Sequence, residues 1–167
     1  GDFKVDYTPV FGDAIDLQRL GEIGKKGVLA LMCDSTNAER AGFTMSEKTV
    51  GKVLDTIFTD HKNKRIIVST FASNVDRVQQ IINCAYNHGR KVVIEGRSMV
   101  NIISTATELG YIHIPEHTLI DIEQLKDYPD ELTVLITTGS QRESMAALSR
   151  MASGMHRKVT IKPNDLI

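Results

Sequence analysis

The chain has 167 residues, of which 41% are hydrophobic and 25% charged, and its formal net charge at pH 7 is −1. This composition excludes a disordered or fibrous chain, and the length accommodates one full-sized core with at most a fragment of a second. The near-neutral charge excludes bulk attraction to nucleic acid or to an anionic membrane surface, so any site for a polyanion has to be local.

Targeting signals and cysteine usage indicate a cytoplasmic protein with no membrane partner. No apolar stretch approaches the roughly 18 residues of a membrane span, and the N-terminus lacks the regions of a signal peptide. Cys33 and Cys84 are the only two cysteines. Two thiols without metal-like spacing fit a reducing compartment better than a secreted disulfide scaffold.

The first forty residues differ in character from the remainder. Alternating residues 3–7 predict a half-buried strand, residues 16–24 a helix, and the apolar run 28–32 a strand that leads to Asp34. The chain starts without methionine and stops at residues 165–167, both times in a strand-like pattern. We therefore expect a segment of a longer polypeptide, in which residues 1–40 are the end of a neighbouring domain, present only in part, and residues 41–167 form the main domain.

Residues 41–167 alternate between apolar runs and helical patterns. The runs 65–68, 91–94, 132–136 and 159–161 predict strands, and most are continuous Val, Ile and Leu, as in parallel strands buried on both faces. Helices are predicted from Ser46 onward, from residue 75 to a stop at Gly89, over 98–109 before Gly110, and over 144–152 before Gly154. The pattern predicts an α/β fold: a Rossmann-like parallel sheet with helices on both faces. Residues 112–130 are less regular, since Pro115 and Pro129 interrupt them.

Polar loops follow three of the predicted strands, at residues 33–37, 69–74 and 137–141. In open α/β sheets the ligand crevice lies beyond the carboxyl ends of the strands, where hydroxyls, backbone N–H groups and helix N-termini converge on an anion. The loop at 69–74 adds an aromatic ring at Phe71 and a cation at Arg77, a combination typical of single-stranded nucleic-acid sites. The plainer interpretations, an N-cap for Ser73 or Asn74 and core packing for Phe71, stay open.

Other motifs are weaker. Gly139 permits close backbone approach and has Arg142 and Arg150 nearby, but its loop is a weak motif on its own. Asp34 could ligate a metal at a strand end, although a solitary Asp is more often a turn or cap residue. The five histidines form no H-x-H or H-x-x-x-H pair, and neither a Walker loop nor a nucleophile elbow occurs.

Several blocks in one order together resemble bacterial ribonuclease J: GDFK at residues 1–4, TP at 8–9, CDSTN at 33–37, STFASN at 69–74, GRSM at 96–99, TGSQ at 138–141 and MAALSR at 145–150. Ribonuclease J is a metallo-β-lactamase-fold ribonuclease with an inserted β-CASP domain. It cuts RNA by 5′-to-3′ exonucleolytic and by endonucleolytic hydrolysis at two zinc ions. The resemblance implies that this chain is the β-CASP segment, preceded by a strand-helix-strand piece of the lactamase domain.

The resemblance also implies roles for particular residues. Asp34 would correspond to the carboxylate that bridges the two metals. The RNA and its 5′-monophosphate would be held by Ser69, Thr70, Phe71, Ser73, Asn74, Arg77, Thr138, Gly139, Ser140 and Gln141. The family's H-x-H-x-D-H and H-x-S-G-H motifs are absent from this sequence, so the segment alone is expected to bind no zinc pair and to contain no catalytic residue. The rest of the ribonuclease J chain, and further copies of it, are the implied partners.

The sequence departs from the family after Gln141, where Gly-Glu-Pro is common and Arg142-Glu143-Ser144 stands here. Losing that proline removes pre-organisation at a helix start. Two other functions stay open: a self-contained α/β module that binds a nucleotide or sugar phosphate with the same loops, and a purely structural or dimerisation domain. The latter predicts exposed apolar patches instead of polar strand-end loops.

Overall fold

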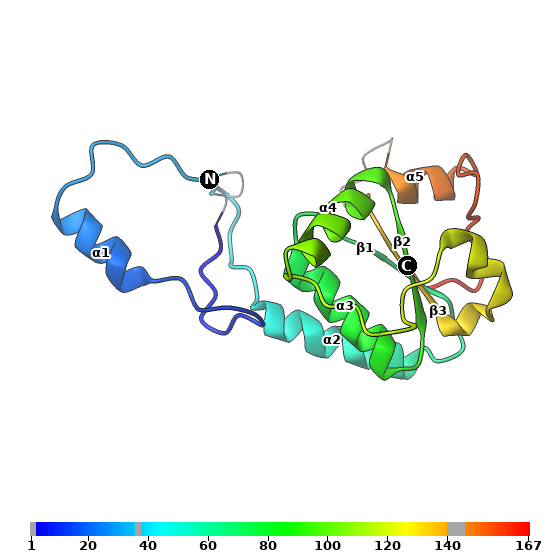
Figure 1. The fold of residues 1–167 in the computed structure, drawn as a ribbon. Coiled ribbons are helices and arrows are strands. Elements are labelled where there is room, and N and C mark those ends of the chain that lie inside the picture. Colours follow the sequence, from blue (N-terminus) through cyan, green and yellow to red (C-terminus); the bar gives the residue numbers. More distant parts are fainter. Residues whose placement is uncertain (1–2, 36–37, 140–145) are drawn as a thin grey trace. The chain divides into compact units, whose positions relative to one another are not determined.

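The computed structural model describes residues 3–35, 38–139 and 146–167 (Figure 1). The chain divides into two compact units, Gly1–Val50 and Gly51–Ile167, each described separately here. The division falls at residue 50, whereas the sequence places a domain boundary near residue 41, and the assignment of residues 1–40 to a separate domain stays a prediction. Among the described helices, none combines the length and apolar character that crossing a bilayer requires.

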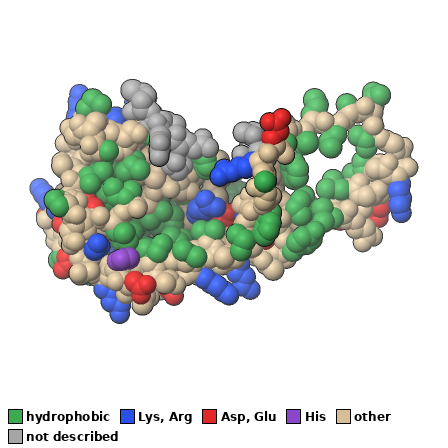
Figure 2. Space-filling view, turned by 180° about the vertical axis from the view of Figure 1, so that it is seen from behind, with side chains coloured by type: hydrophobic (Ala, Val, Ile, Leu, Met, Phe, Trp, Pro, Cys, Tyr) green, Lys and Arg blue, Asp and Glu red, His purple; other side chains and the backbone are tan. Residues whose placement is uncertain are grey.

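The first unit contains helix α1 (Leu17–Lys25), which confirms the predicted helix. The Asp16 side chain caps it by accepting a hydrogen bond from the Arg19 N–H at 2.8 Å. The predicted strands at 3–7 and 28–32 are absent from the described part of this unit. A strand needs a hydrogen-bonded neighbouring strand, and no strand among the described residues pairs with residues 28–32. The side chains of this run are exposed, Leu29 completely. Hydrophobic side chains gather along this unit in Figure 2.

Helix α2 (Glu47–Asp60) begins where Ser46 predicted it. The Ser46 hydroxyl accepts from the Lys48 N–H at 3.2 Å, and the Asp6 carboxylate accepts from the Glu47 N–H at 3.0 Å. These hydrogen bonds satisfy amides that a helix start leaves without intrahelical partners. The same bond to the Glu47 N–H is the main reason why the pKa of Asp6 lies below its ordinary value.

A three-stranded parallel sheet forms the centre of the second unit. Its strands are β1 (Ile66–Ser69), β2 (Lys91–Glu95) and β3 (Thr133–Thr137), in the spatial order β1-β3-β2. Every residue of β3 is buried. The strands predicted near 65–68, 91–94 and 132–136 are therefore confirmed. The strand predicted at 159–161 is wrong: that segment lies beside the sheet as irregular chain, and Leu166 instead forms an isolated parallel bridge with Ile66.

Helices flank the sheet, as predicted. They are α3 (Val75–Asn87), α4 (Arg97–Glu108) and α5 (Ala147–Ala152), and α3 and α4 end just before Gly89 and Gly110. The expected helix over 144–152 is shorter at its start, where residues 144 and 145 lie outside the described residues. The irregular stretch 112–130 contains the 3₁₀ turn η1 (Ile122–Asp127), and a second turn, η2 (Asp130–Leu132), leads into β3.

The two faces of the sheet are covered by different elements. On one face Ile67, Val93 and Leu135 pack with Ala147 and Met151 of α5, and side chains of η1 close the edge of this cluster. The next residues along the strands, Val92, Val134 and Ile136, point to the opposite face, where α3 contacts β2 and β3. Layers of helix on sheet on helix explain why the central strand is apolar throughout.

A buried ion pair fixes the start of β1 to the C-terminal segment. The Arg65 guanidinium donates from Nε to Asp165 Oδ1 at 2.8 Å, pairs with Asp165 Oδ2 as well, and donates to the Thr160 carbonyl at 2.7 Å. Both charged side chains are almost completely buried, at 3% and 2% exposure. Asp165 also accepts from the Lys162 N–H, so each charge has several partners.

We predict that Asp165→Asn lowers the free energy of unfolding by about 3 kcal/mol, because it leaves the buried Arg65 charge uncompensated. Chemical denaturation measures this loss. The matched control is Glu123→Gln, which removes the exposed pair between Glu123 and Lys158 and leaves stability nearly unchanged. Equal losses for the two variants would show that burial does not set the strength of the Arg65 pair.

Candidate functional site

The three strands end level with one another. In the register of the sheet Thr137 of β3 lies opposite Ser69 of β1 on one side and Glu95 of β2 on the other. The segments that follow, beginning at Thr70, Gly96 and Thr138, therefore leave the sheet along one edge. This is the edge at which open α/β sheets bind ligands.

A cleft of about 630 Å³ opens at this edge. It is lined by Thr70, Phe71, Ala72, Gly96, Arg97, Ser98, Thr138, Gly139, Ala146, Ala147 and Arg150. Its size is that of an ordinary small-molecule or cofactor site. The lining that the structure describes includes two arginines and no acidic side chain.

Four of the residues predicted from the sequence meet in this cleft: Thr70, Phe71, Thr138 and Gly139. Phe71 is 43% exposed, so the plain core-packing interpretation does not describe it, and its ring is accessible to a ligand. Ser69, at the end of β1, does not line the cleft. Ser140 and Gln141 lie outside the described residues.

Three other predicted residues lie away from the cleft lining: Ser73, Asn74 and Arg77. Asn74 is the N-cap of α3, and its side-chain oxygen accepts from the Arg77 N–H at 3.1 Å. The capping interpretation left open by the sequence therefore applies to Asn74. Ser73 is an exposed residue of the same turn.

Two buried polar atoms of the cleft lining have no hydrogen-bond partner among the residues that the structure describes. They are the Thr70 hydroxyl, in a residue that is only 3% exposed, and Nε of the Arg150 guanidinium. The Ser69 hydroxyl is unpaired in the same way. Since buried polar groups in folded proteins are nearly always paired, such a concentration at one strand edge indicates a place where a polar ligand completes the hydrogen bonding.

The N-terminus of α4 contributes further donors. Its N-cap is Gly96, which has no side chain to accept from the first amides of the helix, and no side-chain cap is formed. The first N–H groups of a helix have no intrahelical acceptor and carry the positive end of the helix dipole. Together with Arg97 and Arg150, they make the cleft suited to an anion such as a phosphate group.

Other polar groups at this edge are used by the fold itself. The Thr138 carbonyl accepts from the Leu148 N–H at 3.2 Å, and its hydroxyl lies 3.5 Å from the Ala147 N–H, so Thr138 holds the start of α5. Nδ1 of His156 accepts from the Val159 N–H at 3.1 Å, which leaves Nε2 to donate toward Glu95 at 3.2 Å. His156 thereby anchors the last residue of β2, directly before Gly96.

The binding residues predicted from the sequence did not include Gly96, Arg97, Ser98 or Arg150, although Arg150 was noted near the Gly139 loop. A signal was present, because residues 96–98 follow a predicted strand and precede a predicted helix, as the other polar loops do. Gly96 and Arg97 were not predicted as binding residues because their segment has fewer hydroxyl and amide side chains than the loops at 69–74 and 137–141. Its donors are mainly backbone N–H groups, which composition does not display.

Asp34 is exposed in the first unit, and its role as a metal ligand stays a prediction. Among the described residues, a single group of three potential ligands lies close enough together to hold a metal ion, and it consists of Asp55, Cys84 and His88. Within the described part of the chain, Asp34 belongs to no such group, so these residues do not by themselves form a two-zinc site around it.

A family model and curated relatives that cover the whole chain all point to the same family. The family described as Ribonuclease J, beta-CASP domain, matches residues 63–167. Ribonuclease J of Helicobacter pylori (strain J99) is 47% identical over 167 residues, which are 100% of this chain and 24% of that protein. The identity is 44% to Ribonuclease J of Synechocystis (100% of this chain, 26% of that protein). It is 40% to Ribonuclease J2 of Bacillus subtilis (100% and 30%). The chain thus spans between 24% and 30% of the length of these relatives.

Gly96 allows the start of α4 to lie close to Thr138, the residue that follows β3. Its φ of +106° and ψ of 127° disfavour any side chain, and a Cβ atom would lie 3.0 Å from the Thr138 hydroxyl. We predict that Gly96→Ala lowers the free energy of unfolding by about 3 kcal/mol, measured by denaturant titration. Gly110→Ala is the control: its φ is +78° but it has open space around it, so it costs only about 1 kcal/mol. Equal costs would mean that the approach to Thr138 imposes no constraint.

Proposed function

Since the chain belongs to the ribonuclease J family through its β-CASP domain, we propose that the cleft at the strand ends binds RNA. In this proposal the segment is the RNA-holding part of a zinc-dependent ribonuclease that acts as a 5′-to-3′ exonuclease and as an endonuclease, in rRNA processing and mRNA decay. The supporting observation is the meeting of Arg97, Arg150 and the uncapped start of α4 with the unpartnered Thr70 hydroxyl.

The proposed contacts follow from the chemistry of a nucleotide. A backbone phosphate or the 5′-monophosphate accepts from the first N–H groups of α4 and from the guanidinium of Arg97 or Arg150. The exposed ring of Phe71 offers a base a stacking surface, which is worth about 1–3 kcal/mol and tolerates any sequence. The Thr70 hydroxyl lies in the same lining and can donate to the phosphate or to the sugar.

A mononucleotide or sugar phosphate is the second candidate ligand, because the cleft volume of about 630 Å³ also fits a small molecule. The same cationic and aromatic groups would serve it. The two candidates differ in reach: a strand of RNA extends past the cleft and gains affinity with each further nucleotide, whereas a small ligand does not.

The remainder of a ribonuclease J chain is the proposed partner of the first unit. Hydrophobic side chains lie on the surface of the first unit (Figure 2). Leu29, Leu31 and Met32 are among those that are largely exposed, which is unusual for a unit that functions alone. In that larger protein Asp34 would be one ligand of the zinc pair, and the other ligands would come from outside this chain. The protein is further proposed to be cytoplasmic and to form homo-oligomers. The isolated 167-residue chain is accordingly proposed to hold no zinc pair and to be inactive as a nuclease.

We expect Arg97→Ala to weaken binding of a fluorescent 5′-monophosphorylated single-stranded RNA roughly tenfold, because one charge-assisted phosphate contact is lost. The fluorescence anisotropy of the dye and the cleavage of the RNA are followed together, with and without zinc. Arg97 is exposed, so folding is not at risk. The control is Arg157→Ala, which removes an equally exposed cation outside the cleft lining.

Equal weakening by the two arginine variants would contradict the proposed site, since a general loss of charge would then explain it. If uridine 5′-monophosphate binds as tightly as the oligonucleotide, the small-ligand candidate is favoured. Zinc-dependent cleavage by the 167-residue chain would contradict the proposal that it is inactive.

A further inference from the structure

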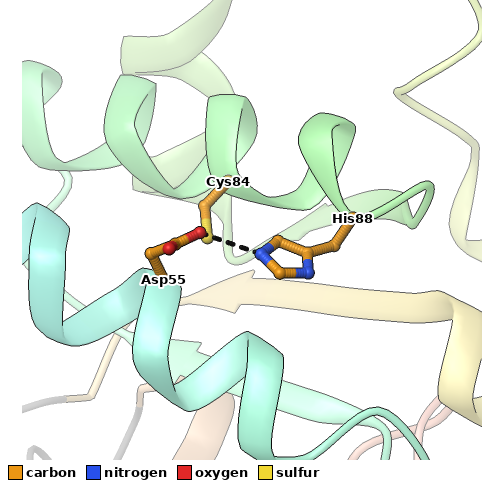
Figure 3. A group of neighbouring side chains, drawn as sticks. All are labelled: Asp55, Cys84 and His88. Atoms are coloured by element: carbon orange, nitrogen blue, oxygen red, sulfur yellow. Dashed lines mark hydrogen bonds and ion pairs between the residues drawn. The ribbon is translucent and has the colours of Figure 1, made fainter.

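A second cluster of chemically active side chains lies on helices α2 and α3, apart from the cleft. Cys84 and His88 are one helical turn apart on α3 and its C-cap, and Asp55 faces them from α2 (Figure 3). None of the three lines the cleft at the strand ends. The turn through Gly89 leads directly from His88 into the start of β2, so the cluster lies toward the opposite edge of the sheet.

The atoms of the cluster that can bind a metal are close together. One sulfur, one imidazole nitrogen and one carboxylate oxygen all lie within 4.8 Å of one another. His88 Nε2 and Asp55 Oδ1 are already 2.9 Å apart. Around a tetrahedral zinc ion, a sulfur and a nitrogen ligand are separated by about 3.5 Å. Small side-chain rotations therefore suffice, and Asp55, whose side chain is 68% exposed, is free of packing that would oppose them.

We propose that Asp55, Cys84 and His88 form a binding site for one divalent transition-metal ion of the zinc type, which clamps α2 to the C-terminal end of α3. A thiolate, an imidazole and a carboxylate are ligands that zinc accepts together, and a water molecule would complete the tetrahedron. The proposal goes beyond RNA binding. It concerns other residues than Asp34 and does not depend on the function proposed for the cleft.

The C-terminal end of α3 favours a cation at the cluster. Cys84 lies in the last turn of α3, and His88 is the C-cap, where the negative end of the helix dipole is found. The neighbouring Arg90 opposes a cation by its charge. However, its guanidinium is turned toward the Lys64 and His61 carbonyls, to which it donates at 2.8 Å each, and it lies over the Phe58 ring.

Binding requires the loss of one proton. Burial raises the pKa of the Cys84 thiol to about 11, so without metal the sulfur carries its proton at neutral pH. When a metal–sulfur bond forms, the thiol proton passes to solvent. The hydrogen bond between His88 Nε2 and Asp55 is replaced by two bonds to the ion, and the proton that Nε2 donated to the carboxylate moves by exchange with solvent to Nδ1, so that a neutral imidazole binds the ion through Nε2. The buried thiol limits the affinity. The bound ion would add metal–ligand bonds between two helices that are already joined by packing, including the Phe58 and His88 rings, and by the hydrogen bond between His88 and Asp55.

Cobalt(II) is the probe of choice, because a cobalt–thiolate bond gives a charge-transfer absorption that binding to carboxylates alone does not. The chelator-treated 167-residue chain is titrated with cobalt(II) and then with zinc(II). We expect one equivalent of cobalt to produce the absorption and zinc to abolish it. Cys84→Ala should eliminate the absorption, and Asp55→Asn should weaken cobalt binding at least tenfold without endangering the fold, because that side chain is exposed.

Two matched variants localise the signal. Cys33→Ser removes the other cysteine, which is exposed, and Asp34→Asn removes the carboxylate expected to serve the zinc pair of a full ribonuclease. Both should leave the cobalt spectrum and the affinity unchanged. Zinc should also raise the melting temperature of the wild-type chain and of these two variants but not that of His88→Gln. Absence of the charge-transfer band in the wild-type chain, or its persistence in Cys84→Ala, would overturn the proposal.

Discussion

The pairing of β3 with a strand on each side is the constraint on which the rest of the second unit depends. Because β3 is buried on both faces, its position is set by packing, and its hydrogen bonds then set the register of β1 and β2. A slip of one residue would turn every side chain of a strand to the other face of the sheet, so the register is strongly specified. The level ends at Ser69, Glu95 and Thr137 follow from it.

Given those level ends, the polar groups at the edge divide into two classes. Asn74, Thr138 and His156 each complete hydrogen bonds of the fold: a helix cap, the start of α5 and the end of β2. The Thr70 hydroxyl and the Arg150 Nε atom form no hydrogen bond with the described part of the chain, and the first amides of α4 have no side-chain cap. Only the second class is available to a ligand without weakening the protein, which is why the cleft, and not the whole loop set, carries the functional proposal.

Local sequence signals predicted most of the second unit because they coincide with its tertiary packing. Continuous apolar runs predicted β1, β2 and β3, and the glycines that follow α3 and α4 predicted where these helices end. The run 28–32 shows the limit of this reasoning. Its pattern satisfies every local requirement of a strand, yet a strand exists only where another strand pairs with it, and no strand among the described residues pairs with this run. The run 159–161 fails differently, because Val159 is buried in the cluster beside α5 without joining the sheet.

The candidate sites were harder to predict than the fold, for a related reason. A sequence shows side chains, so the hydroxyl-rich loops at 69–74 and 137–141 were evident, while the backbone donors at the start of α4 were not. The cluster of Asp55, Cys84 and His88 was not predicted from the sequence because Asp55 belongs to a different helix from the other two residues. Cys84 and His88 alone, four residues apart, are a common accident of composition, and only the packing of α2 on α3 brings a third ligand to them.

The two proposed sites share one physical origin in the polarity of a parallel α/β unit. Since strands run one way and the connecting helices return the other way, helix N-termini gather at the carboxyl edge of the sheet and helix C-termini at the amino edge. The start of α4 thus offers positive dipole charge and unsatisfied N–H groups to an anion. The end of α3 offers negative dipole charge beside a thiol, an imidazole and a carboxylate. An anion at one edge and a cation at the other is therefore the arrangement that this topology favours, so the two sites can be occupied independently.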